Sequence, residues 1–193
     1  MTAAVKKPDA ESDPFAHVRR ATNQHRGRHG CGAYPYDNGP LLSVIAAAVQ
    51  ARRILELGTA LGYTAISFAY GAPNSTVDTV ERDPDHAILA RENIAAAGFD
   101  HRITVHEGDF ASVLATLEAS YDLAFFDGGT PGPALHKTLR QLLRTGGTLI
   151  TANLNHGGSA DTVAKALFDG KSWRSALVRG WRDCDQREAV TSV

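Results

Sequence analysis

The stretch ILELGTALGYTAISFA, residues 54–69, predicts a strand, a tight turn and a helix in direct succession. Ile54–Leu57 is brief and mostly apolar, as in a buried strand, and Gly58 and Gly62 set a turn directly before the helix. Only glycine lets a backbone approach a ligand closely while its φ is positive. The helix then presents free N–H groups and a partial positive charge, which can hold a carboxylate or a phosphate.

The alternation of strand and helix continues toward the carboxyl terminus. It favours parallel pairing through right-handed crossovers, and hence a doubly wound α/β sheet with helices on both faces. Weaker β signals at Ala176–Val178 and Ala189–Val193 add an antiparallel edge, so we predict a mostly parallel, seven-stranded, Rossmann-like sheet. Such sheets bind ligands beyond the carboxyl ends of their strands. The five parallel strands are predicted at Ile54–Leu57, Thr76–Val80, Ile103–His106, Leu123–Phe126 and Thr148–Thr151.

Two helices have limits that the sequence indicates. A helix is predicted over Asp83–Ala97 because the aspartate can cap it, a proline follows in its first turn, and Gly98 suits the left-handed position that ends it. Apolar residues also recur at helical spacing from Pro40, and we expect Arg52 and Arg53 to lie in the last turn of that helix.

The composition is typical of one globular domain. The chain has 193 residues, of which 43% are apolar and 21% charged, enough for a sizeable core. Its net charge of -1 indicates no particular class of partner. Cys31 and Cys184 form neither a CxxC pair nor a series of metal-ligand spacings, and no signal peptide or membrane span is predicted. We therefore expect a cytoplasmic protein.

Residues 1–29 mix charged, proline and small polar residues without sustained apolar periodicity. We expect a flexible N-terminal arm there, ahead of a domain over residues 30–193. The arm holds the chain's only basic stretch, but no aromatic residues interleave it for stacking on bases, so a solvated face is favoured over a nucleic-acid contact. Its basic side chains are His17, Arg19, Arg20, His25, Arg26, Arg28 and His29.

Polar residues follow the first three predicted strands, at the edge where their carboxyl ends meet. Glu56 precedes the glycine turn, would repel a pyrophosphate and favours a cationic ligand. Glu81 ends the second strand, where a carboxylate can accept hydrogen bonds from both hydroxyls of a ribose. Gly108 and Asp109 form a turn after the third strand. The combination predicts a cofactor site, with a purely structural glycine turn and a surface carboxylate as the alternatives.

In these motifs the sequence resembles the class I S-adenosylmethionine-dependent methyltransferases, most of all the small catechol and caffeoyl-CoA-type O-methyltransferases. The resemblance covers residues 38–158 through NGPLLSVI, ILELGTALGYTAISFA, VERDP, EGDFASVL, YDLAFFDGG and GGTLITANLNHGG. It implies S-adenosylmethionine as the cofactor. By matching positions it assigns the methionine part to Glu56, Gly58, Gly62 and Thr64, the ribose to Glu81, and the adenine surroundings to Arg82, Asp109 and Phe110. Gly108, in the turn before Asp109, is also expected to be a cofactor-binding residue.

The acceptor end of the implied site departs from the family's pattern. Asp127, implied to border both cofactor and acceptor, is not followed by the family's lysine, and the family's Asp-Asn pair reads Ala152-Asn153 here. Because Mg²⁺ needs near-octahedral oxygen ligands and commonly one or two carboxylates, Asp127 and Asn153 alone would make a weak site. We therefore expect methyl transfer without a metal, with a divalent ion at these two residues as the alternative. Another base is then needed, and His156 is the candidate, with a solvated loop histidine as the alternative. His136 is expected at the surface.

We therefore predict an enzyme that moves a methyl group from S-adenosylmethionine to an oxygen nucleophile of a small molecule. The alternative is a binding or regulatory module that keeps the cofactor and has lost catalysis. The chain lacks the Asn/Asp-Pro-Pro-aromatic motif of base-amino methyltransferases, which argues against nucleic acid as the substrate. Related enzymes often dimerise, so a homodimer is compatible with the sequence. The acceptor itself depends on variable loops and is not predicted.

Overall fold

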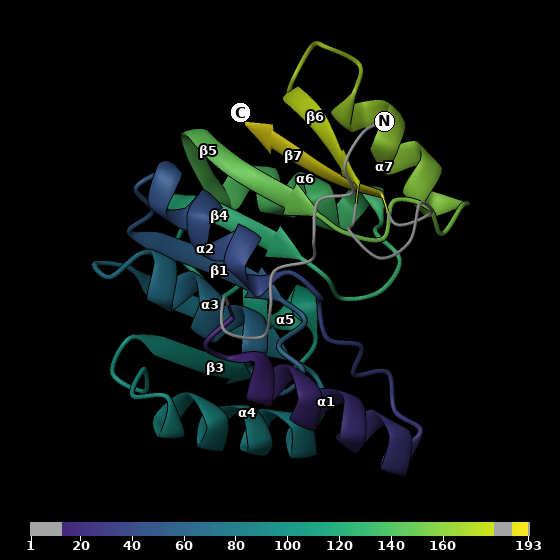
Figure 1. Ribbon diagram of the computed structural model, residues 1–193. Coiled ribbons are helices and arrows are strands. Elements are labelled where there is room, and N and C mark those ends of the chain that lie inside the picture. Colours follow the sequence, from purple (N-terminus) through teal and green to yellow (C-terminus); the bar gives the residue numbers. More distant parts are fainter. Residues whose placement is uncertain (1–12, 180–186, 193) are drawn as a thin grey trace, which may run out of the picture.

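Figure 1 shows the computed structural model of the chain, which describes residues 13–179 and 187–192. Its centre is one seven-stranded sheet in the order β3-β2-β1-β4-β5-β7-β6. Strands β1 to β5 pair in parallel, whereas β7 runs antiparallel to both β5 and β6, which confirms the predicted fold class. The strands are β1 (Arg53–Leu57), β2 (Thr76–Glu81), β3 (Ile103–Glu107), β4 (Tyr121–Phe126), β5 (Leu143–Thr151), β6 (Arg174–Arg179) and β7 (Arg187–Ser192).

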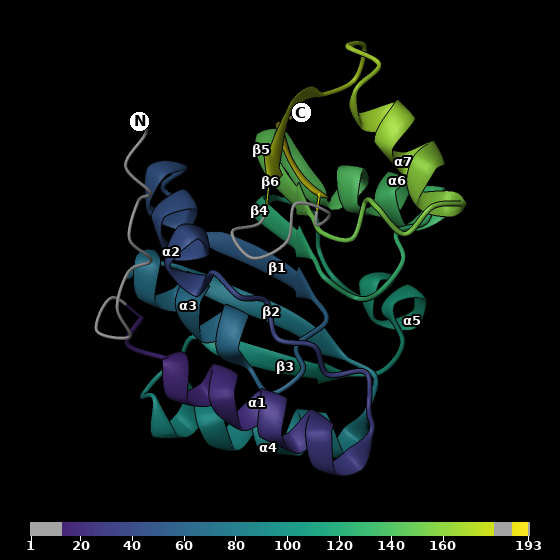
Figure 2. The ribbon, with the colours of Figure 1, turned by 45° about the vertical axis from the view of Figure 1, so that its right-hand side comes forward.

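Helices cover both faces of the sheet (Figures 1 and 2). Helices α1 to α4 contribute buried side chains to one hydrophobic cluster, and α5 to α7 contribute to a second cluster. No helix in the described ranges is long and apolar enough to cross a membrane. The helices are α1 (Ala16–His29), α2 (Gly39–Ala48), α3 (Tyr63–Gly71), α4 (Pro84–Ala96), α5 (Phe110–Leu114), α6 (Pro133–Leu142) and α7 (Ser159–Leu167).

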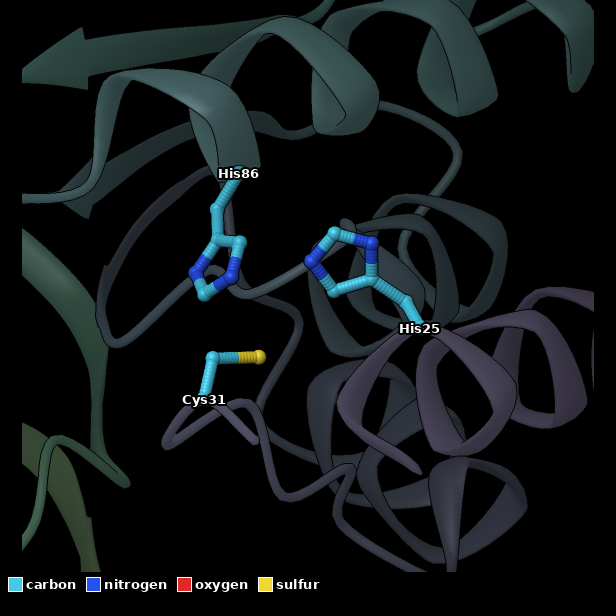
Figure 3. A group of neighbouring side chains, drawn as sticks. All are labelled: His25, Cys31 and His86. Carbon is cyan, nitrogen blue, oxygen red and sulfur yellow. The ribbon is translucent and has the colours of Figure 1, made fainter. Parts of the chain in front are cut away.

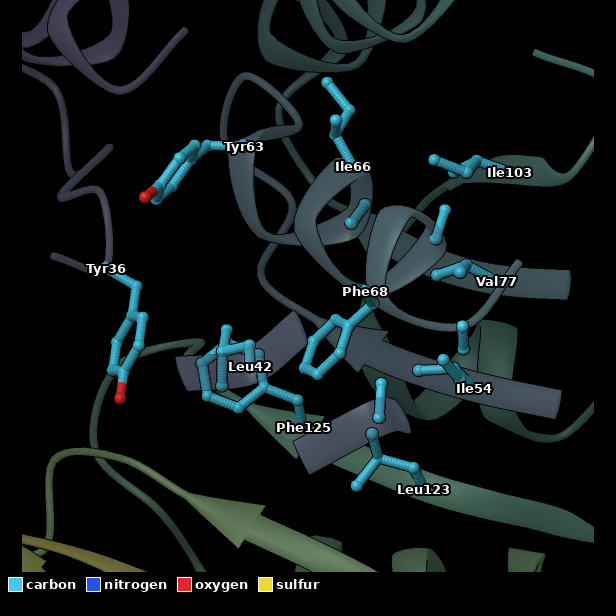
Figure 4. Packing of buried hydrophobic residues seen from close by; sticks show 14 of the residues in the cluster. Tyr36, Leu42, Ile54, Tyr63, Ile66, Phe68, Val77, Ile103, Leu123 and Phe125 are labelled. Atoms are coloured by element: carbon cyan, nitrogen blue, oxygen red, sulfur yellow. The ribbon is translucent and has the colours of Figure 1, made fainter. Parts of the chain in front are cut away.

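The two clusters follow from the alternation of side chains along the central strands. Successive strand residues point to opposite faces, so Ile54 of β1 joins the first cluster and Leu55 the second. Phe125 and Phe126 of β4 divide in the same way. Figure 4 shows Phe125 beside Phe68 of α3, with the two ring centroids 5.6 Å apart. Both faces of the central strands are therefore covered, and ligand access is confined to the ends of the strands.

The predicted limits of α4 are confirmed and those of α2 are wrong at one end. Asp83 caps α4 by accepting hydrogen bonds from two backbone N–H groups, and Gly98 follows with φ 79°. The α2 helix ends at Ala48, well before Arg52 and Arg53, which we expected in its last turn. Gln50, with φ 51°, turns the chain, and Arg53 already pairs with the neighbouring strand as the first residue of β1.

The expected flexible arm is wrong for residues 16–29, because they form α1; residues 1–12 lie outside the described part. Val18 is 1% exposed within the first cluster, although too few apolar residues flank it to give a periodic pattern. Polar contacts complete the docking at the start of the helix. The Tyr63 hydroxyl donates to Asp13 Oδ2 at 2.7 Å and accepts from the Gly39 N–H at 3.0 Å. The segment thus packs on the domain predicted to begin at residue 30.

Two of the basic side chains of α1 contact residues of the same chain. Arg19 lies 3.6 Å from the Asp13 carboxylate, and the Arg26 guanidinium stacks over the Tyr34 ring at 4.1 Å. The Asp13 carboxylate balances the charge of Arg19, whereas Arg26 keeps its positive charge over the Tyr34 ring. That this stretch makes no nucleic-acid contact stays a prediction.

Candidate functional site

In the turn between β1 and α3, the backbone at position 58 has a conformation and a close neighbour that only glycine fits. Its φ is 101°, and a Cβ built there would lie 2.9 Å from the backbone oxygen of Asp127. Gly62, with φ 92°, is the N-cap of α3, and Ala60 between the two glycines also has a positive φ of 45°. The turn therefore runs close against the end of β4, and its N–H groups lie at the amino-terminal end of a nine-residue helix.

Glu56 lies beneath this turn and not on its open side. Its side chain is fully buried, and its carboxyl group accepts hydrogen bonds from the hydroxyls of Thr64 on α3 and, at 2.5 Å, of Thr79 on β2. Desolvation by burial raises the pKa of Glu56 to about 8, with the charges of Asp127 and Glu81 acting in the same direction. Glu56 is therefore protonated at neutral pH and joins α3 to the sheet. The sequence did not predict this supporting role.

Glu81 lies at the carboxyl end of β2 as predicted, and its orientation is held by backbone groups. Its Oε2 accepts from the Ala60 N–H at 2.8 Å, and its Oε1 accepts from the Asp83 N–H at 2.9 Å. The first of these bonds ties the carboxylate directly to the glycine turn. Arg82, beside it, is exposed. The ends of β1 and β2 thus meet as predicted, and backbone N–H groups fix the Glu81 carboxylate between them.

The third strand end reaches the same edge of the sheet. The Gly108 N–H donates to the Glu81 carbonyl at 2.9 Å, and Asp109 caps α5 by accepting from the Ser112 N–H at 3.0 Å. The hydroxyl of Ser112 also donates to Asp109, and these bonds lower the pKa of Asp109. Phe110 packs against Gly128, where a Cβ would collide with its ring. Phe110 therefore links this turn to the loop that follows β4.

Asp127 and Asn153 meet at the ends of β4 and β5. Asn153 has φ 63°, and its Nδ2 donates to Asp127 Oδ1 at 3.1 Å and to the Gly129 carbonyl at 3.2 Å. The neighbouring Ala152 is buried and offers no ligand atom. Among the residues that the structure describes, no group of three histidine, cysteine or carboxylate side chains at metal-binding distance includes Asp127.

The two candidate histidines have opposite surroundings. His156 is exposed, and its Nδ1 lies 3.3 Å from the Thr130 hydroxyl oxygen in the loop after β4. His136, which we expected at the surface, is buried on the side of α6 that faces the sheet, with its Nε2 3.0 Å from Thr151 Oγ1. Burial lowers the pKa of His136. The surface prediction was wrong because a histidine near the start of an amphipathic helix lies here on the face that meets the sheet.

A narrow pocket opens beside the glycine turn, and the N-terminal segment forms one of its walls. The opposite wall comes from the turn itself, residues 58–61, together with Thr64 and Asp127. The sequence prediction missed the N-terminal wall, since residues 1–29 were expected to be flexible and no role was assigned to the aromatic residues after them. That wall consists of Thr22 from α1 and of Tyr34, Pro35 and Tyr36 from the loop before α2.

A family model described as O-methyltransferase matches residues 6–168, which is most of the chain. The chain belongs to the O-methyltransferase family. The resemblance predicted from the strand-end motifs is thereby confirmed, and the match also includes α1, which the motifs did not cover. In this chain, both the N-terminal segment and the turn after β1 contribute residues to the pocket beside Gly58.

Similar proteins include several O-methyltransferases. "Catechol O-methyltransferase" of Mycobacterium tuberculosis is 37% identical over 136 residues, 65% of this chain and 62% of the relative. "Catechol O-methyltransferase" of Niastella koreensis is 34% identical over 122 residues, 61% of this chain and 55% of the relative. The chain spans about six-tenths of the length of these two relatives.

Solved structures of O-methyltransferase folds superpose over nearly the whole chain. The cofactor-bound structure of Rv0187 from MTB is 26% identical with a TM-score of 0.79, covering 98% of each chain. The O-methyltransferase TomG from Streptomyces achromogenes, in complex with SAM, is 24% identical with a TM-score of 0.80, covering 99% of this chain and 92% of its own. The second comparison supports the fold alone.

Proposed function

We propose that this member of the O-methyltransferase family transfers a methyl group from S-adenosylmethionine to a hydroxyl oxygen of a small molecule. The observation that carries the proposal is the hydrogen bond from the Ala60 N–H to Glu81, which joins the glycine turn and the strand-end carboxylate into one cradle. The cofactor-bound Rv0187 structure supports a bound cofactor at this fold, and the relatives named catechol O-methyltransferase support an acceptor with a phenolic hydroxyl.

The residues of the cradle fit the parts of S-adenosylmethionine. Gly58 and Gly62 let the turn adopt positive φ and pack closely against Asp127 and α4. The start of α3 suits the carboxylate of the methionine part. Glu81 is held by two N–H groups, and each of its oxygens retains lone pairs for ribose hydroxyls. Thr64 lines the same pocket, whereas Glu56 acts as a positioning residue through Thr64. We assign the adenine surroundings to Arg82, Gly108, Asp109 and Phe110.

The acceptor side would consist of Asp127, Asn153 and His156. The cofactor supplies an electrophilic methyl group, so the chain's own residues align the acceptor, exclude water and remove one proton. With Nδ1–H donating to Thr130, the Nε2 lone pair of His156 takes the proton of the acceptor hydroxyl. Asn153 orients the Asp127 carboxylate by its amide hydrogen bond. Since Ala152 replaces a carboxylate, we propose that this step runs without Mg²⁺.

Cofactor binding is tested by calorimetric titration with S-adenosylhomocysteine. We expect binding by the wild type and a loss of affinity on the order of tenfold or more in Glu81→Gln, because hydrogen bonds to a charged acceptor contribute about 1.5–3 kcal/mol each. Glu107→Gln is the matched control, since Glu107 pairs with Glu81 across the sheet and is exposed. No binding by folded wild-type protein, or equal losses in both variants, would overturn the assignment.

Turnover separates an enzyme from a cofactor-binding module. Wild-type protein is incubated with labelled S-adenosylmethionine and a panel of catechols and hydroxycinnamoyl esters, and methylated products are measured by mass spectrometry. Label on a phenolic oxygen supports the proposal. Tight cofactor binding without any product across the panel contradicts the methyl transfer while leaving the cofactor site in place.

We further propose a homodimer in the cytoplasm. Val44 and Tyr70 expose large apolar side chains on the contacting helices α2 and α3, and the Cys31 thiol is free. Light scattering on the purified protein tests the dimer, and a monomeric mass at high concentration contradicts it. Fluorescence microscopy of a tagged copy tests the location.

A further inference from the structure

Three side chains that can bind a transition metal lie together (Figure 3), and one of them, His86, is 3.9 Å from Glu81 of the candidate site. They are His25 near the end of α1, Cys31 in the loop that follows, and His86 in the first turn of α4. One ligand atom from each lies within 4.8 Å of the other two. In the described ranges this is the one group of three or more histidine, cysteine or carboxylate side chains at such distances. The proposed methyl transfer uses none of the three.

We propose that His25, Cys31 and His86 form a binding site for one zinc-class divalent ion. A thiolate with two imidazoles is a ligand set that Zn²⁺ favours, and it is softer than the oxygen set that Mg²⁺ or Ca²⁺ takes. Bonds to nitrogen and sulfur of about 2.0–2.3 Å place tetrahedral ligand atoms about 3.3–3.6 Å apart. The observed group therefore needs to close by roughly 1 Å, which side-chain rotation can supply.

The surroundings of His86 add negative charge at the same place. Its Nε2 lies 3.9 Å from Asp83 Oδ2 and its Nδ1 lies 3.9 Å from Glu81 Oε1, both beyond hydrogen-bond distance. Two carboxylates at this range favour a bound cation. Asp83 or a water would then complete four-fold coordination, while Glu81 stays bonded to the Ala60 and Asp83 N–H groups. His86 itself is buried, as expected of a ligand whose position is fixed by the protein.

The ligands come from two parts of the chain that are far apart in sequence. Helix α1 lies beside α4 in both overall views (Figures 1 and 2), and the His25 and His86 rings are 5.1 Å apart between centroids. An ion held by all three would tie the end of α1 and the following loop to α4. That loop continues into Tyr34 and Tyr36, which line the pocket. The proposed ion would therefore stabilise the N-terminal wall of the pocket.

Cobalt(II) is the probe for this site, because it replaces Zn²⁺ and reports thiolate coordination by absorption. The full chain without an affinity tag is stripped of metal by a chelator and titrated with Co²⁺. We expect one equivalent to bind with a sulfur-to-cobalt charge-transfer band and the visible bands of a tetrahedral ion. Zn²⁺ affinity is then measured by competition with a chromophoric chelator.

The variants Cys31→Ser and His25→Ala should each lower Zn²⁺ affinity on the order of 100-fold. Loss of an outer-shell contact already lowers metal affinity by about 10–100-fold, and each of these variants removes a direct ligand. Cys31→Ser should also remove the charge-transfer band. His17→Ala, an exposed histidine on the same helix, and Cys184→Ser, the chain's other cysteine, are the matched controls and should leave both readouts unchanged. Circular dichroism confirms that each variant is folded.

The proposal is overturned if folded wild-type protein shows no thiolate band, or if Zn²⁺ affinity is the same in wild type, Cys31→Ser and His25→Ala. Neither outcome depends on cofactor binding, so it is distinct from a failure of the methyl-transfer proposal.

Discussion

Replacing Glu56 with glutamine exchanges the buried carboxyl group beneath the glycine turn for an amide of nearly the same shape, which cannot ionise. The carboxyl group is fully buried, and burial raises its pKa to about 8, although Thr64 and Thr79 both donate hydrogen bonds to it. In the unfolded chain the same group has its ordinary pKa of 4.5. Between these two values the unfolded chain has lost the proton and the folded chain retains it.

The sign of the pH dependence follows from this difference. Below the lower pKa both states are protonated and Glu56 has no effect of this kind. As pH rises above it, ionisation favours the unfolded chain, so the free energy of unfolding falls by about 1.4 kcal/mol per pH unit until the folded group also ionises. From about pH 5 to about pH 7.5 the wild type should lose about 3 kcal/mol through this one group. Glu56→Gln should lose none of it.

Urea unfolding followed by circular dichroism measures this effect across the same pH range. The quantity compared is the difference in free energy of unfolding between wild type and Glu56→Gln. Histidines that titrate in the same pH range affect both proteins equally, so their effect cancels in this difference. Glu92→Gln on α4 is the matched control, since Glu92 is exposed, and its difference from wild type should not change with pH. If the difference for Glu56→Gln also stays constant, then Glu56 does not carry a proton in the folded protein and the reasoning is refuted.

The other predictions concern the turn, the N-terminal helix and the acceptor side. Gly58→Ala places a Cβ against Asp127 at a φ of 101°, and should cost about 1–3 kcal/mol of unfolding free energy and abolish S-adenosylhomocysteine binding, measured by urea unfolding and calorimetry. Val18→Ala removes a buried side chain of α1 and should cost about 1–3 kcal/mol; an unchanged unfolding midpoint would show that α1 is not packed on the core. His156→Ala and His156→Gln should each lower turnover by about 10²–10⁴-fold with cofactor affinity unchanged, and wild-type turnover in both would remove His156 as the base. Added Mg²⁺ should change the rate by less than about twofold, whereas strong activation would show that Asp127 and Asn153 hold an ion.

The sheet and its ligand-binding edge were predictable because their signals are local. Gly58, Glu81 and Gly108 each follow a short apolar strand within a few residues, and parallel pairing brings such strand ends to one edge. The cap of α4 at Asp83 is local in the same sense.

The features that the sequence did not predict depend on residues distant along the chain. Helix α1 is held by Val18 in the core and by a hydrogen bond between Tyr63 and Asp13, 50 residues apart. The burial of His136 depends on Thr151 from the next strand. Likewise His25 and His86 are neighbours only because two helices lie side by side, which no spacing along one segment indicates.

The wall of Thr22, Tyr34, Pro35 and Tyr36 beside the pocket bears on how fast an occupant can exchange. An occupant enclosed by this wall leaves when the segment opens, and the segment is anchored through the buried side of α1. If local opening of α1 is required, it would set how fast the occupant exchanges, while contacts with the wall and with the sheet side would together set the equilibrium affinity. Homologous chains that differ only in this N-terminal segment would therefore differ in turnover limited by product release, even with the same cradle beneath.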